Sequence, residues 1–566
     1  TIENQSDVPI SEILVPASPG LQLDKLTFAG DGALISFDSV LNVNHYRLQE
    51  PLLPGQRTRM QFKTSTTPPA GFAVHAASDN VPEVSPVEVI GNGTSLLNLR
   101  IMPAIGYTDR VEHKPAWKRR KYGLPEQWQP PHGVAAERQG HGTLHLGWVE
   151  SLEMTIRTDA DQIAVHAGVL EEEWTEPNGR RGFRYKINHK SRGWSSIVSA
   201  RYEKRVFEHA GLPAVEVYYD PQHAANVEPF AIALHEAMEY FARHYGPPPF
   251  ETFRLAEQSL HYAGFSSRSG FATCSEILGW KSDLNASGGE DIRQMAALMM
   301  ALSWWGDQVI PANVAGAKVI HAGIPYWSAA LYLRSIRDSE TDVRLRRQAA
   351  MELFRHRGEM VDQEAPFFEE FKDSTMIRKK GAFLMLHLED QLRCETNAVE
   401  LVSLLSDFLA ECRYREPPYP TATELLKHLE SHVPPSLHSQ LADIFTRVTS
   451  YSVRIREATC HALEEGRWQL TAEVDVHQFV TEGWGVQTEV PFDTPITIMA
   501  FAGREPSDDH VLWESNKVWA SGTNRIEATL DSQPRLLGVD PFLTLPDAHP
   551  HDNLRVPVVE PLGTHR

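Results

Sequence analysis

The sequence has few cysteines, and this scarcity excludes one class of protein. Its four cysteines, in a chain of 566 residues, are too few for a disulfide scaffold and too scattered for a CxxC metal site. Cys394 and Cys412 flank one predicted helical stretch. In an oxidising compartment they would form a disulfide. Two buried free thiols are an equally supported alternative.

Long hydrophobic runs are also missing. No stretch approaches the roughly 20 consecutive apolar residues of a membrane span. The first residues, TIENQSDVPISE, have neither the basic nor the apolar region of a signal peptide. These absences predict either a cytoplasmic protein or a soluble domain of a larger protein.

Basic residues are outnumbered by acidic ones. The chain has 54 Lys and Arg against 74 Asp and Glu, a formal net charge of −20. Such a surface repels phosphate backbones, so nucleic acid is not an expected partner. The apolar share of 42% and the charged share of 23% are ordinary for a soluble folded protein. The length exceeds one hydrophobic core and predicts about three or four domains.

Several catalytic motifs are absent or weak. The sequence contains no GxSxG elbow and no GxxxxGK[ST] phosphate loop. His141 and His145 in HGTLHLGW are expected to be a surface pair. The segment DAHPHDN gathers His549, His551 and two aspartates, and a turn-rich polar tail is preferred to a metal site. Cys274 with His261 is a remote possibility for a thiol nucleophile.

The hydrophobic periodicity changes twice along the chain and predicts three regions. Residues 1–225 read as β-structure, with a hairpin turn at Asn178-Gly179. Residues 226–450 show helical spacing in stretches such as FAIALHEAMEYFARHYG and GEDIRQMAALMMALSWWG. Residues 451–566 alternate again, around a turn at Glu464-Glu465-Gly466. The Pro-, Lys- and Arg-rich span 106–133 is predicted to run over the surface.

The order of these regions and several local stretches resemble the aminopeptidase-N-like zinc peptidases, or gluzincins. The resembling stretches span the chain and include PAIGYTDR, VEVYYDPQH, WWGDQVIPANVAGA, KKGAFLMLHLEDQL and GVDPFLTLPDAHPHDNLRV. The closer likeness is to the peptidase-like extracytoplasmic domain fused to some bacterial ABC transporter permeases. The resemblance implies a multidomain α+β fold. Its parts would be an N-terminal β saddle or sandwich, a thermolysin-like middle domain and a C-terminal β-sandwich-like domain.

The zinc motif of that family is not present where the resemblance places it. A gluzincin needs two histidines four residues apart on one helix face, with a glutamate as general base. Alignment on Trp304-Trp305-Gly306 puts Leu298 and Leu302 at the histidine positions and Met299 at the glutamate position. The position of the third ligand holds His321 or Ala322, depending on a one-residue register. A lone histidine hydrogen-bonded in a former site is the preferred interpretation of His321.

Three further residues are candidates for binding a ligand. Arg378 stands where the family has its oxyanion-stabilising tyrosine, and its guanidinium could bind a carboxylate or polarise a carbonyl. A structural salt bridge to Asp or Glu is the preferred interpretation. The stretch YAGFSSRSGFATCSEILGW lacks the GxMxN-type motif that grips a substrate amine. It offers Arg268 and Glu276 instead, and its Ser275-Glu276 pair resembles the transporter-fused group.

The sequence therefore predicts a catalytically inactive peptidase-like domain, which is not an enzyme and carries no cofactor or metal. A groove expected between the β saddle and the middle domain would bind a peptide or protein through Arg268, Glu276, His321 and Arg378. The resemblance implies as partners the membrane-embedded permease and the ATPase subunit of an ABC transporter, and a periplasmic location. The alternative is a hydrolase or peptidase with a relocated, non-HExxH site. A purely structural spacer is a third possibility.

Overall fold

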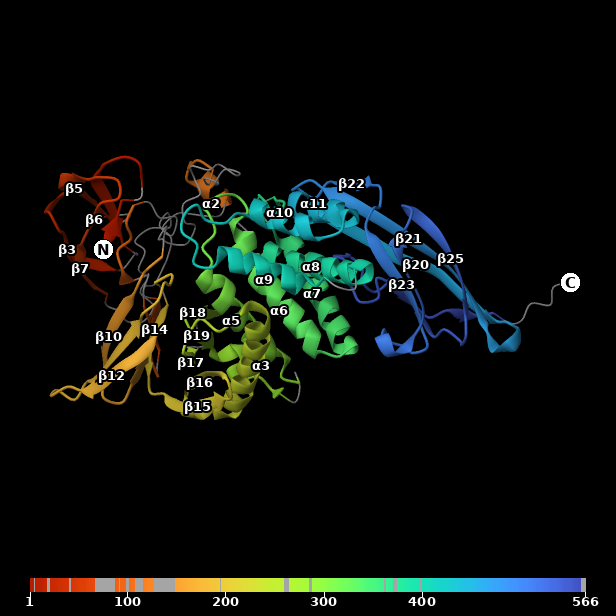
Figure 1. Ribbon diagram of the computed structural model, residues 1–566, viewed down its shortest axis with the longest axis horizontal. Helices are drawn as coiled ribbons and strands as arrows, with labels where there is room; N and C mark the ends of the chain where they lie inside the picture. The colour runs from red at the N-terminus through yellow and green to blue at the C-terminus, as the bar shows by residue number, and fades with distance from the viewer. Residues whose placement is uncertain are drawn as a thin grey trace. The chain divides into compact units, whose positions relative to one another are not determined.

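The computed structural model describes most of the chain and shows two compact units. The described residues are 1–4, 6–17, 21–39, 42–66, 87–90, 92–97, 101–106, 116–126, 148–193, 195–258, 264–284, 288–360, 363–369, 374–396 and 399–560. The first unit comprises Thr1–Trp128, Gln139–Ile310 and Tyr414–Pro417, and the second comprises Gln129–Arg138, Pro311–Arg413 and Pro418–Arg566. Both contain sheets and helices (Figure 1), so the predicted mixed α+β architecture is confirmed.

The first unit begins with three small antiparallel sheets. Their orders are β1-β6, β2-β5-β4 and β3-β7. Alternating side chains of β2, β3 and β5, namely Ile13, Val15, Leu26, Phe28 and Tyr46, make their common core. The strands are β1 (Ile2–Glu3), β2 (Ile10–Pro16), β3 (Gln22–Phe28), β4 (Gly32–Asp38), β5 (Val43–Leu52), β6 (Arg57–Thr58) and β7 (Met60–Ser65).

Two larger sheets and a short helix follow in the same unit. The sheets run β11-β14-β9-β8 and β10-β13-β12. Their strands are β8 (Val87–Ile90), β9 (Gly93–Leu97), β10 (Leu152–Thr158), β11 (Ile163–Val165), β12 (Val169–Thr175), β13 (Arg181–Ile187) and β14 (Ser196–Ala200). The helix α2 (Ala116–Lys121) lies in the described part, residues 106 and 116–126, of the basic span that was predicted to run over the surface.

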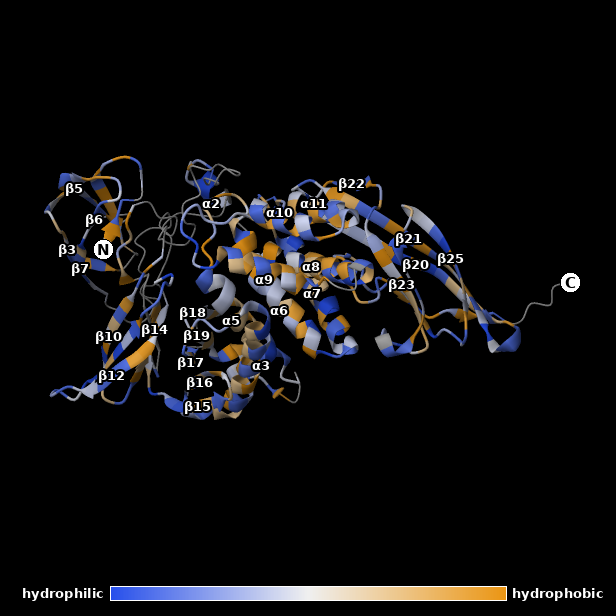
Figure 2. Cartoon of the chain, in the orientation of Figure 1, coloured by the Kyte–Doolittle hydropathy of each residue, from blue (hydrophilic) through white to orange (hydrophobic). Residues whose placement is uncertain are grey.

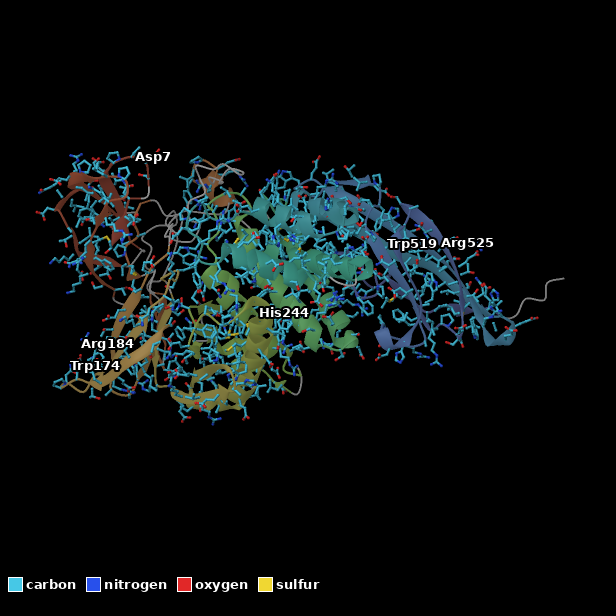
Figure 3. The ribbon with its side chains drawn as sticks, in the orientation of Figure 1. Asp7, Trp174, Arg184, His244, Trp519 and Arg525 are labelled. Atoms are coloured by element: carbon cyan, nitrogen blue, oxygen red, sulfur yellow. The ribbon has the colours of Figure 1, made fainter. Side chains whose placement is uncertain are left out.

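The hairpin of β12 and β13 forms at the predicted turn. Gly179 has φ +86°, a conformation that glycine adopts without steric cost, and its N–H donates to the carbonyl of Glu176 at 2.9 Å. On the ladder Trp174 covers Gly182, where a Cβ atom would come within 2.2 Å of the indole. Figure 3 labels Trp174 together with Arg184, which pairs with Glu172 across the hairpin.

A five-stranded sheet forms the centre of the first unit. Its order is β15-β16-β17-β19-β18, and the pairs β16–β17 and β17–β19 are parallel. Helix α3 packs on this sheet and on helix α5 (Figure 1). The elements are β15 (Glu203–His209), β16 (Leu212–Tyr219), η3 (Pro221–Asn226), α3 (Val227–Tyr245), β17 (Thr252–Gln258), β18 (Phe265–Arg268), β19 (Phe271–Ser275), the π-type turn η4 (Glu276–Trp280) and α5 (Glu290–Gln308).

The second unit starts with helices. Helix α10 begins at a capping box formed by Thr421 and Glu424. The hydroxyl of Thr421 accepts a hydrogen bond from the N–H of Glu424 at 3.2 Å, and the carboxylate of Glu424 accepts one from the N–H of Thr421 at 2.9 Å. The elements are η5 (Val319–Gly323), α6 (Ile324–Ile336), α7 (Ser339–Glu359), α8 (Ser374–Thr396), α9 (Leu401–Cys412), α10 (Ala422–His432), η6 (Pro435–Leu437) and α11 (His438–Thr446).

Strands close the second unit. One sheet runs β22-β21-β20-β28 with β25 on the other edge of β21, and another runs β24-β23-β26-β27. Hydrophilic and hydrophobic residues both occur along the long strands β20 and β21 (Figure 2). The elements are β20 (Thr449–Ala462), η7 (Glu464–Gly466), β21 (Trp468–Thr481), β22 (Gln487–Val490), β23 (Pro495–Phe501), η8 (Asp508–His510), β24 (Val511–Val518), β25 (Gly522–Leu530), β26 (Leu536–Val539), β27 (Leu554–Arg555) and β28 (Val558–Val559).

The segment around Asp547 is held by hydrogen bonds to the backbone. The carboxylate of Asp547 is buried and accepts from the backbone N–H groups of Val453 at 2.9 Å and His549 at 2.8 Å. The predicted turns are present around His549 and His551. The turn at Glu464-Glu465-Gly466 also forms, with Glu465 at φ +63°.

The predicted division at about residues 225 and 450 stays a prediction. Helix α3 begins at Val227 and strand β20 at Thr449, close to both positions. The five-stranded sheet extends across the first of them, because β16 pairs with β17. No helix among the described residues has the length and apolar character of a membrane span. Cys394 and Cys412, both described, form no disulfide.

Candidate functional site

Helix α5 presents apolar side chains at the positions where the resemblance places zinc ligands. Met299 is fully buried, Leu298 is nearly so, and Leu302 is half-buried. Ile292 and Ala296, on the same stripe, are buried too. Leucine has no ligand atom, and a thioether is not among the ligands of hydrolytic zinc sites. The zinc that the resemblance implies therefore does not fit these positions.

The WWG stretch at the end of α5 anchors the helix on α3. Trp304 packs on Phe241 with ring centroids 5.8 Å apart, and Trp305 meets Tyr245 edge-on at 5.7 Å. The indole N–H of Trp304 donates to the carbonyl of Gly246 at 3.1 Å. This stretch, which resembles the peptidase family, is therefore explained by packing in this chain.

Arg268, a predicted ligand-binding residue, contacts the same helix from strand β18. Its guanidinium lies against Gly306, where a Cβ would come within 3.0 Å of Nη1, and Nη1 donates to the carbonyl of Ser267 at 2.6 Å. Burial raises the pKa of Asp307 to about 6, against the opposing effect of Arg268 and of a 2.6 Å bond from the N–H of Ser269. Arg268 is thus part of a polar network around a buried carboxyl.

His321, Ala322 and Arg378 belong to the second unit. Ring nitrogen Nδ1 of His321, in η5, lies 2.9 Å from the carbonyl oxygen of Ala317. Arg378, on α8, stacks over the ring of Tyr326 at 5.1 Å and donates to its hydroxyl at 3.3 Å. Nη2 also donates to Thr375 at 3.3 Å, and no carboxylate among the described residues pairs with Arg378. Ala322 is half-buried and has no side-chain donor or acceptor.

The described part of the chain contains one group of metal-ligating side chains, in the first unit. It consists of His223, Glu257 and Glu276, whose ligand atoms all lie within 4.8 Å of one another. We call it the strand-end cluster. Glu257 is buried, and the other two are half-buried. Sequence reasoning missed His223 and Glu257, and it named Glu276 only as a possible ligand contact. The predicted His141–His145 pair and His261 lie outside the described residues.

The parallel strands explain why these three residues meet. β16, β17 and β19 are adjacent and point the same way. His223 follows the end of β16, Glu257 is the next-to-last residue of β17, and Glu276 directly follows β19. The carboxyl edge of parallel strands is where open α/β sheets bind ligands. Recognition of β17 and β19 as parallel strands would have been the signal for the cluster.

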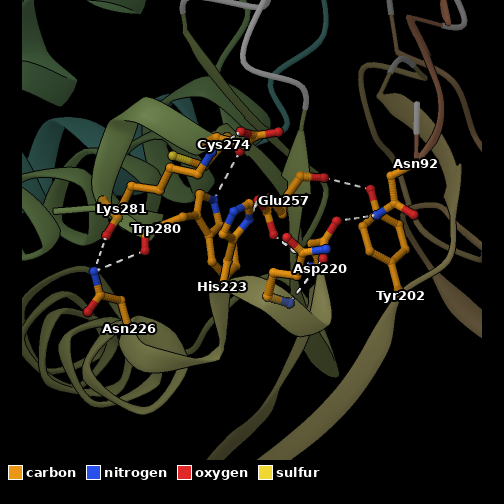
Figure 4. Close-up of polar contacts among 12 residues, drawn as sticks. Asn92, Tyr202, Asp220, His223, Asn226, Glu257, Cys274, Trp280 and Lys281 are labelled. Carbon is orange, nitrogen blue, oxygen red and sulfur yellow. Dashed lines mark hydrogen bonds and ion pairs between the residues drawn. The ribbon is translucent and has the colours of Figure 1, made fainter. Parts of the chain in front are cut away.

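The contacts around Glu257 hold its carboxylate in place. His223 Nδ1 shares a short hydrogen bond with Glu257 Oε1. The N–H of Asp220 donates to the other oxygen at 2.7 Å, and the hydroxyl of Tyr202 donates to the backbone carbonyl of Glu257 at 2.5 Å. Figure 4 shows His223 and Asp220 beside Glu257. Burial raises the pKa of Glu257, and the bonds from Asp220 and His223 oppose the shift.

The turn η4, which carries Glu276, is fixed by Asn226. The buried side-chain amide of Asn226 donates to the carbonyls of Gly279 at 2.5 Å, Trp280 at 3.2 Å and Ser282 at 2.9 Å. Figure 4 shows Asn226 near Trp280 and Lys281. Lys281 Nζ pairs with Glu276 at 2.6 Å from the solvent side. The pKa of Lys281 is raised by this bond.

Cys274 is close in sequence to the cluster but is not a reactive thiol. Its Sγ is buried and donates to the carbonyl of Leu278 at 3.0 Å. Burial raises the pKa of the thiol, which disfavours the nucleophilic thiolate. The remote possibility of a thiol nucleophile at Cys274 gains no support from this environment.

Comparison with known proteins supports the aminopeptidase-like fold. No family model matches the chain. Over 129 residues, 22% of this chain and 11% of the relative, it is 28% identical to transcription initiation factor TFIID subunit 2 of Schizosaccharomyces pombe. All of the chain superposes on 56% of the crystal structure of Legionella pneumophila aminopeptidase A in complex with aspartic acid, with a TM-score of 0.53 and 13% identity.

A second solved structure is that of a two-domain M1 zinc metallopeptidase, a point mutant bound to L-tryptophan. The likeness covers 78% of this chain and 87% of that one, with a TM-score of 0.49 and 14% identity. The chain thus spans about half the length of the aminopeptidase and about a tenth of the transcription factor subunit.

The likeness to aminopeptidase A corrects one prediction from the sequence. The absence of a zinc motif on α5 led us to expect that the chain is not an enzyme. That prediction is contradicted, because the structure whose fold the chain shares is that of an aminopeptidase. The prediction assumed that the loss of one motif removes all catalytic activity, whereas one fold can carry sites at different places. At 13% identity the likeness establishes the fold.

Proposed function

We propose that the chain is a peptidase, or a closely related hydrolase of acyl bonds, whose site is the strand-end cluster rather than helix α5. The observation that carries the proposal is the meeting of His223, Glu257 and Glu276, within 4.8 Å, at the carboxyl edge of three parallel strands. The aminopeptidase-like fold supports the reaction class.

The cluster contains the groups that hydrolysis requires. Attack of water on an acyl carbon needs a proton acceptor, and His and Glu are the usual ones. A pKa raised from the ordinary range of a carboxyl improves a base at neutral pH, and burial shifts Glu257 in this direction.

The proposal is tested by turnover of a panel of aminoacyl anilides and of a peptide mixture read by mass spectrometry. The wild-type chain should hydrolyse members of the panel. Glu257→Gln and Glu276→Gln should each lower kcat/KM by about 100-fold or more, since a positioned acid–base group contributes this much. Glu276 is half-buried, so its variant should fold even if Glu257→Gln does not.

Two control variants make the test specific. Glu239→Gln removes an exposed carboxylate of helix α3 in the same unit and should keep the full rate. Met299→Leu alters the position of the family's general base on α5 and should also keep it. Absence of turnover over the whole panel would refute the proposal, as would a Glu276→Gln variant with the wild-type rate.

We also propose, from the sequence resemblance, that the chain works beside the membrane-embedded permease and ATPase subunit of an ABC transporter, on the periplasmic side. The stretches PAIGYTDR and GVDPFLTLPDAHPHDNLRV support this placement. The gene on both sides of the segment that encodes Thr1–Arg566 is the test. Hydrophobic spans in the same reading frame are expected, and their absence on both sides would contradict the placement.

A further inference from the structure

We infer that the strand-end cluster is a binding site for one first-row divalent metal ion of the Zn²⁺ type. The inference rests on the proposed function and deepens it, because it names the cofactor of the same site: with an ion bound, His223, Glu257 and Glu276 would serve as its ligands rather than as the proton acceptor. It rests on the donor set, on the geometry and on the charge of His223, Glu257 and Glu276.

The donor set selects the class of metal. One imidazole nitrogen with one oxygen from each of two carboxylates is a mixed nitrogen and oxygen set, which suits Zn²⁺ and its neighbours better than Mg²⁺. Three protein ligands leave the fourth tetrahedral position to water, as in catalytic rather than structural zinc sites. The site would therefore supply the activated water that the proposed hydrolysis needs.

The geometry requires His223 and Glu257 to exchange their direct hydrogen bond for bonds to the ion, and Glu276 to move toward them. Ligand atoms on one tetrahedral zinc lie roughly 3.4 Å apart, as follows from bonds of about 2.1 Å. The three ligand atoms are already within 4.8 Å of one another, and Glu276 is half-buried, so its side chain can move. Glu257 is held by the N–H of Asp220 at 2.7 Å, which is the kind of outer contact that orients metal ligands.

The charge of the cluster calls for a cation. The two carboxylates carry negative charge that the ammonium of Lys281 offsets only in part, and a divalent ion would neutralise the remainder. In the structure, His223 and Lys281 are the groups that pair with Glu257 and Glu276. The side chain of Lys281 is 47% exposed, so it can turn into solvent when an ion takes its place.

The inference is tested by calorimetric titration of the EDTA-treated chain with Zn²⁺, and by the visible absorption bands of Co²⁺ bound in its place. One ion per chain is expected, with tetrahedral Co²⁺ bands and no comparable binding of Mg²⁺. His223→Gln and Glu276→Gln should each weaken Zn²⁺ binding at least 100-fold. Lys281→Ala should tighten it several-fold, because it removes a competing charge.

A control separates this site from chance binding to surface histidines. His428 and His432, one helical turn apart on α10, have ring centroids 4.6 Å apart and could take up Zn²⁺ weakly. His432→Ala should leave the high-affinity ion in place. Circular dichroism of each variant shows that it is folded. Absence of high-affinity binding, binding abolished by His432→Ala, or binding unchanged by both His223→Gln and Glu276→Gln would overturn the inference.

The metal and the function can fail separately. Zn²⁺ bound through His223 and Glu276, without turnover of any substrate, would refute the proposed hydrolysis and support the metal site. Full activity of the metal-free chain, lost in Glu276→Gln, would support the hydrolysis and overturn the metal site.

Discussion

Helix α5 and the strand-end cluster belong to the same unit and have opposite chemistry. On α5 the positions of the family's ligands hold Leu298, Met299 and Leu302, which pack in an apolar interior. At the strand ends, His223, Glu257 and Glu276 bring two carboxylates and an imidazole together. The helix keeps the sequence likeness without ligand atoms, whereas the cluster has ligand atoms without a recognisable motif.

The difference shows that a likeness to a family motif and the presence of a chemical site are separate observations. A helix that packs through Trp304 and Trp305 on α3 is retained for stability, whatever its other face carries. Burial of a carboxylate such as Glu257 lowers the stability of the fold unless the carboxylate is paired, so a buried and paired carboxylate is a candidate for function. The polar cluster, rather than the apolar helix, is therefore the better place to look for chemistry in this fold.

The largest expected effect is that of a carboxylate on the apolar face of α5. Met299→Glu should lower the free energy of unfolding by about 4 to 5 kcal/mol, because it buries a charge with no partner. Chemical denaturation measures the loss. Met299→Leu, which conserves volume, should cost less than about 1.5 kcal/mol. Equal stability of the two variants would contradict the claim that this face of α5 is an apolar interior, unlike the cluster.

The next effect concerns the support of Glu276. Asn226→Ala should lower the free energy of unfolding by about 3 kcal/mol, since it leaves three carbonyls near η4 without the amide that they share. The same variant should weaken Zn²⁺ binding. Asn524→Ala, on the edge strand β25 of the second unit, removes a side-chain amide that bonds the carbonyl of Ala520, and as the control it should cost about 1 kcal/mol. A loss at Asn226 no larger than at Asn524 would mean that Asn226 does not fix the turn.

The buried carboxyl beside α5 should make stability depend on pH. The pKa of Asp307 is about 6 in the folded chain and near its ordinary 3.8 when unfolded, so the folded state binds the proton more tightly. This stabilisation is complete below about pH 4 and is lost as the pH rises through about 6. The free energy of unfolding should fall by about 2 kcal/mol over this range, because one pKa unit corresponds to about 1.4 kcal/mol.

Asp307→Asn removes the titrating group and provides the comparison. Unfolding measured at several pH values should show a flatter profile for the variant between pH 4 and about pH 7. Parallel profiles for the two proteins would assign the pH dependence to other groups.

The smallest effect is expected at the exposed ion pair of the cluster. Lys281→Ala should change the free energy of unfolding by less than about 0.5 kcal/mol, since ion pairs in solvent contribute little. Chemical denaturation at two salt concentrations measures it. A loss above about 2 kcal/mol would show that Lys281 is structural, and it could not then give way to a metal ion.

Much of the fold could be predicted because it depends on local patterns. The helical spacing around Phe230 and Met299, and the turns at Gly179 and Glu465, are encoded within a few residues. Strand β17 was missed because nearly all of its residues are buried, so it shows no alternation. The resemblance implied a strand ending at Ser275-Glu276, where β19 lies, but its parallel pairing with β17 could not be predicted. Without these strands, the five-stranded sheet and its carboxyl edge could not be predicted.

The sequence by itself determined what α5 lacks: no arrangement of the chain can give Leu298 or Leu302 a ligand atom. It also determined most helices and hairpins, since their periods are local. Only the tertiary structure decided that His223, Glu257 and Glu276 meet, because parallel strands bring together residues that are distant along the chain. Long-range pairing leaves no periodic signal in any one segment, and the proposed site depends on it.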